Sequence, residues 1–149
     1  MSDNQCSCGF IIAERNEKSN RWLLCHPTNG GQRWDFPKGL VDDNEDHLVT
    51  AIRELEEETG LILILDDDNV IDLGQHNYRP KKDLHLFYIE LKKININELT
   101  CRSMVNLNEQ SFPEMDAFGL FNIKDVRSKV CKNLLKWIST NVPSDLLVL

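Results

Sequence analysis

The sequence lacks long apolar runs. Its 149 residues are 41% hydrophobic and 7% aromatic, and no stretch approaches the roughly 18 consecutive apolar residues that a membrane-spanning helix needs. The first ten residues, MSDNQCSCGF, contain neither a basic segment nor a long apolar one, so nothing in them suggests a secretion signal. We therefore expect a cytoplasmic chain without a membrane partner.

Cysteine is present, but it follows no disulfide or zinc pattern. The five cysteines are an odd number, and Cys6 and Cys8 form C-x-C, with no second pair at zinc-finger distance. Adding Cys25 and His26 does not produce the usual zinc spacing, so we expect reduced thiols, as in a cytosol. The G-x-S-x-G and P-loop motifs are also absent, and the four histidines form no nucleophile pattern.

Basic residues are fewer than acidic ones. The chain has 24 Asp and Glu residues against 17 Lys and Arg, a formal net charge of −7. Such a chain repels phosphate backbones, which excludes duplex nucleic acid and anionic membranes as general partners. A small anionic substrate would need something positive between it and the protein. The length predicts one domain over residues 1–149, as a monomer or a homodimer.

Short apolar runs alternate with two helical patterns. Strands are expected at residues 9–13, 22–25, 61–65, 70–77, 84–92 and 118–121, with an acidic turn at 66–68. The first helix is capped by Asp43 or Asn44 and ends at Gly60. A second helix is expected over 125–141, with Pro143 beyond its end. Strands with two helices imply a layered α/β or α+β domain.

The first helix carries carboxylates along one edge. At about 100° per residue, Glu54, Glu57 and Glu58 lie within about a third of a turn of each other, beside the apolar stripe. Like charges at these spacings repel, so the three side chains are either well solvated or gathered around a cation. Ligand sets made only of oxygen select hard ions, and Mg²⁺ or Mn²⁺ is the expected metal.

The segment that contains these glutamates resembles the Nudix box. The signature of that family is G-x5-E-x7-R-E-U-x-E-E-x-G-U, where U is a bulky aliphatic residue, and residues 39–61 fill it without a gap or mismatch. At roughly 5–10% usage per fixed position, a chance match at one start site is below about one in 10⁷. The resemblance implies an α/β/α sandwich around a mixed β-sheet, and metal-dependent hydrolysis of a nucleoside diphosphate linked to another group.

The resemblance also implies a role for each polar residue of the box. Glu57 and Glu58 are the expected metal ligands, and Glu54 is a further ligand or the base that deprotonates the attacking water. Arg53 would orient Glu54, and Glu45 would pair with Arg53 and support it from outside the metal shell.

Two positions outside the helix would complete the metal site. Gly39 lacks a Cβ and so permits close approach of the loop, whose backbone carbonyl can join the metal shell. In similar hydrolases a glutamate shortly before the last strand supplies a metal ligand or the base. Glu114 fits that place best and Glu109 fits it less well. Whether Glu54 or Glu114 is the general base stays open.

The resemblance extends beyond the box to residues 33–39, RWDFPKG, which are similar to the branch that hydrolyses dinucleoside polyphosphates asymmetrically. This similarity implies substrates such as diadenosine tri- or tetraphosphate, with ADP-ribose or FAD as further candidates. Two alternatives are removal of pyrophosphate from the 5′ end of triphosphorylated RNA and a non-catalytic nucleotide-binding module. The second alternative usually shows loss of box glutamates, and all three glutamates remain here.

Five residues are expected to bind the substrate. Lys38 would contact a phosphate beside the metal loop. The basic residues Arg79, Lys81 and Lys82 could bind a polyphosphate tail by charge-assisted hydrogen bonds. Tyr78 is the preferred residue for stacking on a base.

Overall fold

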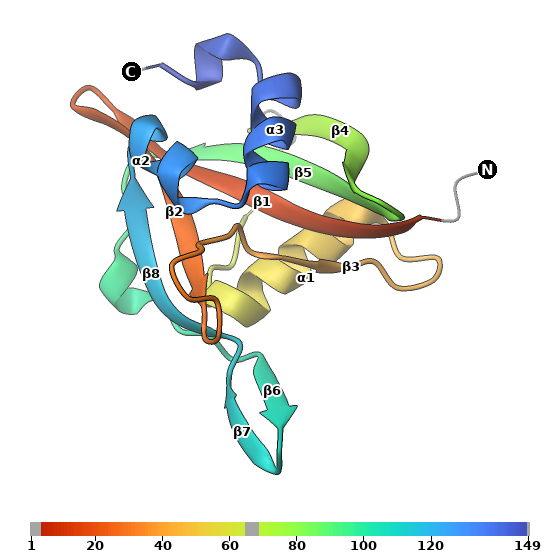
Figure 1. Cartoon of the computed structure of the whole chain (residues 1–149). Coiled ribbons are helices and arrows are strands. Elements are labelled where there is room, and N and C mark those ends of the chain that lie inside the picture. Colours follow the sequence, from red (N-terminus) through yellow and green to blue (C-terminus); the bar gives the residue numbers. More distant parts are fainter. Residues whose placement is uncertain (1–3, 65–68, 149) are drawn as a thin grey trace.

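The computed structural model describes residues 4–64 and 69–148, and its centre is a mixed sheet (Figure 1). The strands of this sheet are β1 (Gln5–Asn16), β2 (Ser19–Pro27), β3 (Lys38–Leu40), β4 (Val70–Arg79), β5 (Lys82–Leu91) and β8 (Met115–Phe121). Their order is β4-β5-β1-β2-β8, with β3 also paired to β1. β1 and β5 run parallel, and the other strand pairs described in this sheet are antiparallel.

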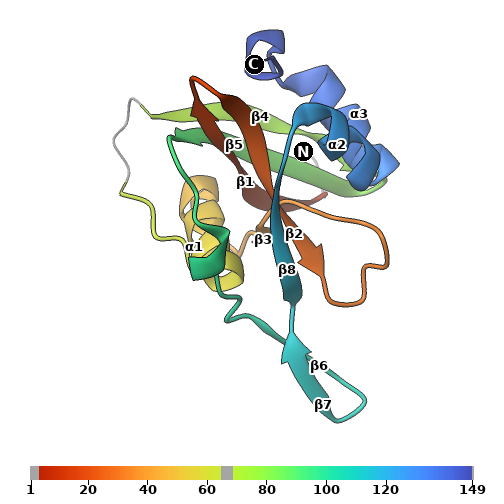
Figure 2. The same cartoon turned by 90° about the vertical axis from the view of Figure 1, so that its left-hand side faces the viewer.

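Helices cover both faces of the sheet (Figure 2). They are α1 (His47–Thr59), α2 (Ile123–Lys129) and α3 (Lys132–Asn141), with short 3₁₀ helices η1 (Ile96–Glu98) and η2 (Ser144–Leu146). Successive side chains of a strand point to opposite faces. Phe10 and Ile12 of β1 therefore pack with α1, whereas Ile11 packs in the core that includes Trp137 of α3. This arrangement confirms the predicted α/β/α sandwich.

Helix α1 begins later than predicted and ends where expected. Its N-cap is Asp46, whose carboxylate accepts two backbone N–H groups of the first turn. The predicted caps Asp43 and Asn44 were wrong, because both residues belong to the preceding loop, where Asn44 has a positive φ of 65°. Gly60 ends the helix with a φ of 81°, the left-handed conformation that glycine adopts without a Cβ clash.

The helix predicted over 125–141 is two helices in the structure. Val130 and Cys131 are extended, with ψ values of 159° and 162°, and they separate α2 from α3. Just before this break, the carbonyl of Lys129 accepts the backbone N–H of Trp34 at 2.9 Å. The apolar spacing is continuous across the break, so periodicity alone could not show it.

A two-stranded sheet, β6 (Met104–Leu107) with β7 (Gln110–Pro113), was not predicted. It projects away from the central sheet (Figure 1). The strand expected at 61–65 is absent over residues 61–64, which are irregular; residue 65 and the acidic turn at 66–68 lie outside the described residues. Among the helices that the structure describes, none is long and apolar enough to cross a membrane.

Candidate metal-binding active site

Several parts of the chain converge on one cleft: β1, β3 with the loop after it, the second half of α1, the segment before β6, and the junction between β7 and β8. Four of its ten lining residues are acidic. The lining residues are Ser7, Lys38, Gly39, Leu40, Asp42, Arg53, Glu54, Glu57, Ser103 and Glu114. Most of the metal and catalytic residues predicted from the sequence are therefore close neighbours in the structure.

Glu58 lies behind this cleft and is fully buried. Its relative exposure is 0%, and when ionised neither carboxylate oxygen accepts a hydrogen bond from a donor group among the residues that the structure describes. Burial, then a hydrogen bond that the protonated Glu58 carboxyl group makes with Glu54, and then the charge of Glu114 raise the pKa of Glu58 to about 10. An unpaired buried carboxylate is costly in free energy. Two oxygens in this environment fit a cation as their partner.

Glu54 is a second carboxyl group whose pKa is raised. Burial raises it most and the charge of Glu57 adds to that effect, while a hydrogen bond with Glu58 and the charge of Arg53 oppose it. An Arg53 Nη1 atom donates to Glu54 Oε1 at 3.1 Å. The Arg53 guanidinium thus fixes the position of the Glu54 carboxyl group, while burial favours the protonated form of that group.

Arg53 joins the carboxylates of α1 to the loop before it. Its Nη2 lies 2.9 Å from Glu45 Oε1, and its Nη1 lies 3.5 Å from Glu57 Oε1. The hydroxyl of Thr50 also donates to Glu45. The ion pair expected between Arg53 and Glu45 is present, and it fixes the guanidinium beside the cleft.

Gly39 lies directly against the Glu54 carboxylate. A Cβ at this position would be 2.1 Å from Glu54 Cδ and 2.2 Å from its Oε1. The absence of a side chain is therefore what lets β3 approach α1 here.

Gly39→Ala is expected to lower turnover with Mg²⁺ by about a hundredfold, because a displacement of about 1 Å at a reacting group can have this effect. The clash falls on the end of a flexible side chain, so Glu54 can move aside and the fold should survive. Steady-state kinetics together with thermal unfolding check both parts. Wild-type kcat in a folded variant would show that the close approach of Gly39 to Glu54 does not position Glu54 for turnover.

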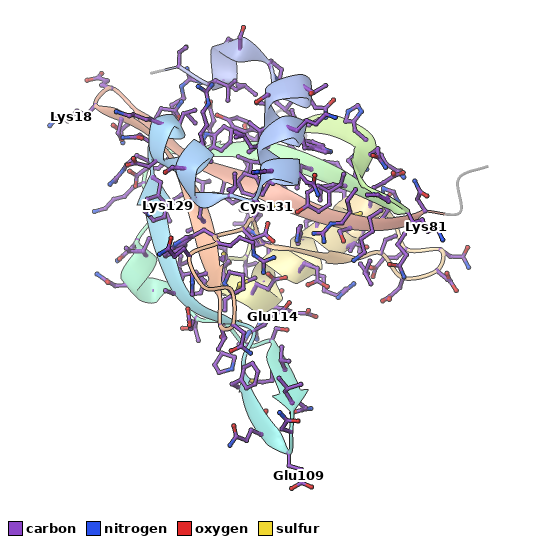
Figure 3. The ribbon with its side chains drawn as sticks, in the orientation of Figure 1. Lys18, Lys81, Glu109, Glu114, Lys129 and Cys131 are labelled. Carbon is purple, nitrogen blue, oxygen red and sulfur yellow. The ribbon has the colours of Figure 1, made fainter. Side chains whose placement is uncertain are left out.

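Glu114 reaches the cleft from the other side. Ser103 Oγ donates to Glu114 Oε2 at 2.7 Å, and the Glu114 N–H donates to the Ser103 carbonyl at 2.8 Å. The alternative Glu109 lies at the tip of the β6–β7 hairpin, far from Glu114 (Figure 3). Ser103 was missed by the sequence reasoning, because it carries no motif and meets Glu114 only through the unpredicted hairpin.

Lys38 places a positive charge at the cleft. Its Nζ lies 2.8 Å from Asp35 Oδ2. Burial on its own would lower the pKa of Lys38, but the Asp35 carboxylate raises it, with a net upward shift. The ammonium group is therefore charged at neutral pH and stands beside the carboxylates of the cleft.

The other predicted substrate-binding residues are not part of the cleft lining. Tyr78 is only 8% exposed in the core that includes α3, its hydroxyl lies 3.2 Å from Cys131 Sγ, and the Arg79 guanidinium lies 4.6 Å from its ring centroid. Its core position differs from the accessible stacking position expected, because its side chain points inward from β4. Lys81 lies at the β4–β5 turn, away from Glu114, and Lys82 follows it (Figure 3).

The NUDIX domain family matches residues 8–138 of this sequence. The chain belongs to this family, which confirms the resemblance of the box. Nudix hydrolases generally use divalent metals such as Mg²⁺ or Mn²⁺.

Several relatives share part of the sequence. Over 92 residues the chain is 40% identical to an uncharacterized 17.7 kDa protein of Enterobacteria phage T4, covering 59% of this chain and 60% of that protein. It is 39% identical over 61 residues to the asymmetrical bis(5′-nucleosyl)-tetraphosphatase of Rattus norvegicus, covering 37% and 42%. It is 37% identical over 65 residues to the RNA pyrophosphohydrolase of Pelagibacter ubique, covering 41% of each. The alignments thus span less than two thirds of each relative.

Solved structures share the fold over nearly the whole chain. The Ap4A hydrolase of C. elegans in a binary complex gives a TM-score of 0.60 at 17% identity, covering 91% of this chain and 93% of that one. The NUDIX domain of Shewanella oneidensis NrtR, complexed with ADP ribose, gives 0.68 at 12% identity, covering 93% and 86%. At these identities the likeness establishes the fold.

Proposed function

We propose that residues 1–149 act as one Mg²⁺- or Mn²⁺-dependent pyrophosphohydrolase domain, whose substrates are nucleoside diphosphates linked to another group, above all dinucleoside polyphosphates. The observation that supports this most is the convergence of four glutamates, Glu54, Glu57, Glu58 and Glu114, around one cleft. In its ionised form Glu58 accepts no hydrogen bond from a donor group of the described residues, as expected of a ligand to a hard cation.

The four glutamates and the backbone carbonyl of Gly39 would hold the metal. When bound, a divalent cation neutralises phosphate charge and makes water a stronger nucleophile at neutral pH. The residues of this chain keep the ligands in place. Arg53 holds Glu54 and Glu57, and Ser103 fixes one oxygen of Glu114.

Glu54 is our candidate for accepting the proton of the attacking water, because it lines the cleft and Arg53 Nη1 holds its Oε1 at 3.1 Å, which orients the carboxylate. After attack, Glu54 would hold that proton while Arg53 keeps the carboxyl group oriented. The ammonium group of Lys38 would contact a phosphate oxygen of the substrate at the same cleft.

A substrate panel tests the proposal. The purified chain with Mg²⁺ or Mn²⁺ is offered dinucleoside polyphosphates, ADP-ribose, FAD, 8-oxo-dGTP and triphosphorylated RNA, and the products are separated by chromatography. We expect diadenosine tetraphosphate to give a mono- and a triphosphate. The identity to an RNA pyrophosphohydrolase favours RNA 5′ ends as the second candidate. Nucleotide binding without turnover of any substrate would favour the non-catalytic module instead.

The double variant Lys81→Ala, Lys82→Ala tests whether a long polyphosphate reaches the β4–β5 turn. If Arg79, Lys81 and Lys82 bind the tail, removal of two positive charges is expected to raise KM several-fold for a four-phosphate substrate and less for a two-phosphate substrate. Steady-state kinetics on both substrates measure the difference. Equal effects on the two KM values would exclude this tail-binding role.

A further inference from the structure

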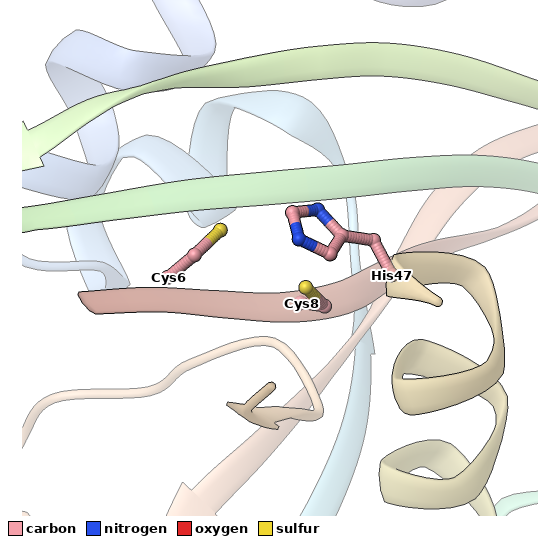
Figure 4. A group of neighbouring side chains, drawn as sticks. All are labelled: Cys6, Cys8 and His47. Atoms are coloured by element: carbon pink, nitrogen blue, oxygen red, sulfur yellow. The ribbon is translucent and has the colours of Figure 1, made fainter. Parts of the chain in front are cut away.

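A second group of potential metal ligands lies outside the glutamate cleft. Cys6 and Cys8 are two residues apart on β1, so their side chains point to the same face of the sheet. His47, the first residue of α1, completes the group, and one ligand atom from each residue lies within 4.8 Å of the others (Figure 4). Cys6 is 6% exposed and Cys8 is 0% exposed, and none of the three residues lines the glutamate cleft.

A chain of hydrogen bonds determines which nitrogen of His47 is available. His85 Nε2 lies 2.6 Å from Asp72 Oδ1, and a carboxylate only accepts, so this nitrogen carries a proton. With both rings neutral, His85 Nδ1 then accepts the N–H of His47 Nδ1, which lies 2.8 Å away. The remaining nitrogen, His47 Nε2, is left with a free lone pair, and Figure 4 shows the ring directed toward the two sulfur atoms.

We propose that Cys6, Cys8 and His47 bind a thiolate-seeking cation of the Zn²⁺ class, at a site separate from the glutamates. Thiolate sulfur and imidazole nitrogen are the ligands that Zn²⁺ prefers. Support of a ligating histidine through its other ring nitrogen, here by His85 and Asp72, is typical of zinc sites. Glutamate oxygens select harder ions, so the two sites differ in the metal they favour.

The ligand atoms lie within reach of a tetrahedral site. With Zn–S bonds of about 2.3 Å, two sulfurs in such a site are about 3.8 Å apart. The three ligand atoms lie within 4.8 Å of one another, and side-chain rotation of Cys6 or Cys8 can adjust their separation. Both thiols release their protons to solvent on binding. Three protein ligands leave a fourth position for water or a small ligand.

A cation at this site would join β1 to the start of α1. The backbone of Cys8 pairs with Gly39 across β1 and β3, and Gly39 contacts the Glu54 carboxylate. A cation bound at the thiolate site therefore links strand β1 to helix α1, which both position the glutamate cleft. Its binding should raise the unfolding temperature of the whole chain.

Co²⁺ titration of the full, reduced, chelator-treated chain tests the proposal, since only thiolate-bound Co²⁺ gives an intense sulfur-to-metal charge-transfer absorption. We expect this absorption to saturate at one Co²⁺ per chain and to disappear when Zn²⁺ is added. Cys6→Ser and Cys8→Ser should each abolish it, whereas the matched control Cys101→Ser should keep it. Glu57→Gln should also keep it, because that residue belongs to the other site.

Thiol labelling of the unmodified chain gives a second measurement that depends on no variant. Zn²⁺ should slow the alkylation of Cys6 and Cys8 below the rate that burial sets in the zinc-free chain, and peptide mapping should show no such change for Cys25, which is also buried. The proposal is overturned if the unmodified chain shows no charge-transfer absorption, or if Zn²⁺ leaves the alkylation rates of both thiols unchanged. Persistence of the absorption in the double variant Cys6→Ser, Cys8→Ser would overturn it as well.

Discussion

Glu57→Gln is expected to lower turnover with Mg²⁺ roughly a thousandfold while leaving the fold intact. Glu57 lies at the edge of the cleft with 43% of its side chain exposed, so the isosteric amide meets no packing constraint. The loss of one anionic ligand removes several kcal/mol of transition-state stabilisation, and about 4 kcal/mol corresponds to a thousandfold in rate.

The neighbouring carboxylate provides a matched control for this variant. Glu56 is on the same helix, pairs with Arg102 at 2.8 Å on the exposed surface, and lies outside the cleft. An exposed pair of this kind contributes about 0–1 kcal/mol to stability, so Glu56→Gln should keep kcat within about twofold. Wild-type kcat in Glu57→Gln, or an equal loss in both variants, would refute the role of Glu57 as a metal ligand.

The parts of the site that sequence could predict are those that depend on local spacing. The separation of Glu54, Glu57 and Glu58 fixes their relative positions as soon as the segment is helical. The pairing of Arg53 with Glu54, in contrast, was implied only by the resemblance to the Nudix box, because adjacent residues do not face each other on a helix. Short continuous apolar runs likewise predict the central strands, because a strand covered on both faces is apolar along its length.

The parts that could not be derived depend on contacts between distant segments. Ser103 meets Glu114 only because β6 and β7 pair, and both strands are short and largely exposed, with little apolar pattern. Tyr78 was expected at a binding surface because aromatic residues serve both stacking and packing, and only the tertiary structure shows that α3 covers it. His47 approaches Cys6 and Cys8 for the same reason, since no spacing rule links a helix start to an earlier strand.

Glu58→Gln is expected to have two opposite effects: it should abolish metal-dependent turnover and stabilise the metal-free protein at pH 7.5. In the unfolded chain this carboxyl group has its ordinary pKa of 4.5, whereas in the folded chain the pKa is about 10. Between these pH values the unfolded chain releases a proton that the folded chain keeps. The contribution of Glu58 to stability is therefore highest below about pH 4.5 and falls as the pH rises toward 10.

The size of the stabilisation follows from this difference. Each pKa unit corresponds to 1.36 kcal/mol, so the three pH units between 4.5 and 7.5 correspond to a cost of about 4 kcal/mol for the wild-type side chain. Glutamine resembles the protonated acid in shape and hydrogen-bonding groups, and it does not ionise. The variant should therefore be more stable than the wild type by about this amount at pH 7.5, with the difference vanishing near pH 4.5.

Chemical denaturation of the chelator-treated proteins between pH 4.5 and 8.5 measures this difference directly. If Glu58 is a metal ligand as proposed, Mg²⁺ should bind the ionised carboxylate, stabilise the wild type and have little effect on the variant. Glu56→Gln again serves as the control, because its exposed carboxylate should give a pH-independent difference near zero. A Glu58→Gln protein less stable than wild type throughout this range would show that the buried carboxyl group is structural. If Glu58 lowers the stability of the metal-free wild type, binding of the ion that the proposed reaction requires would also raise the free energy of unfolding.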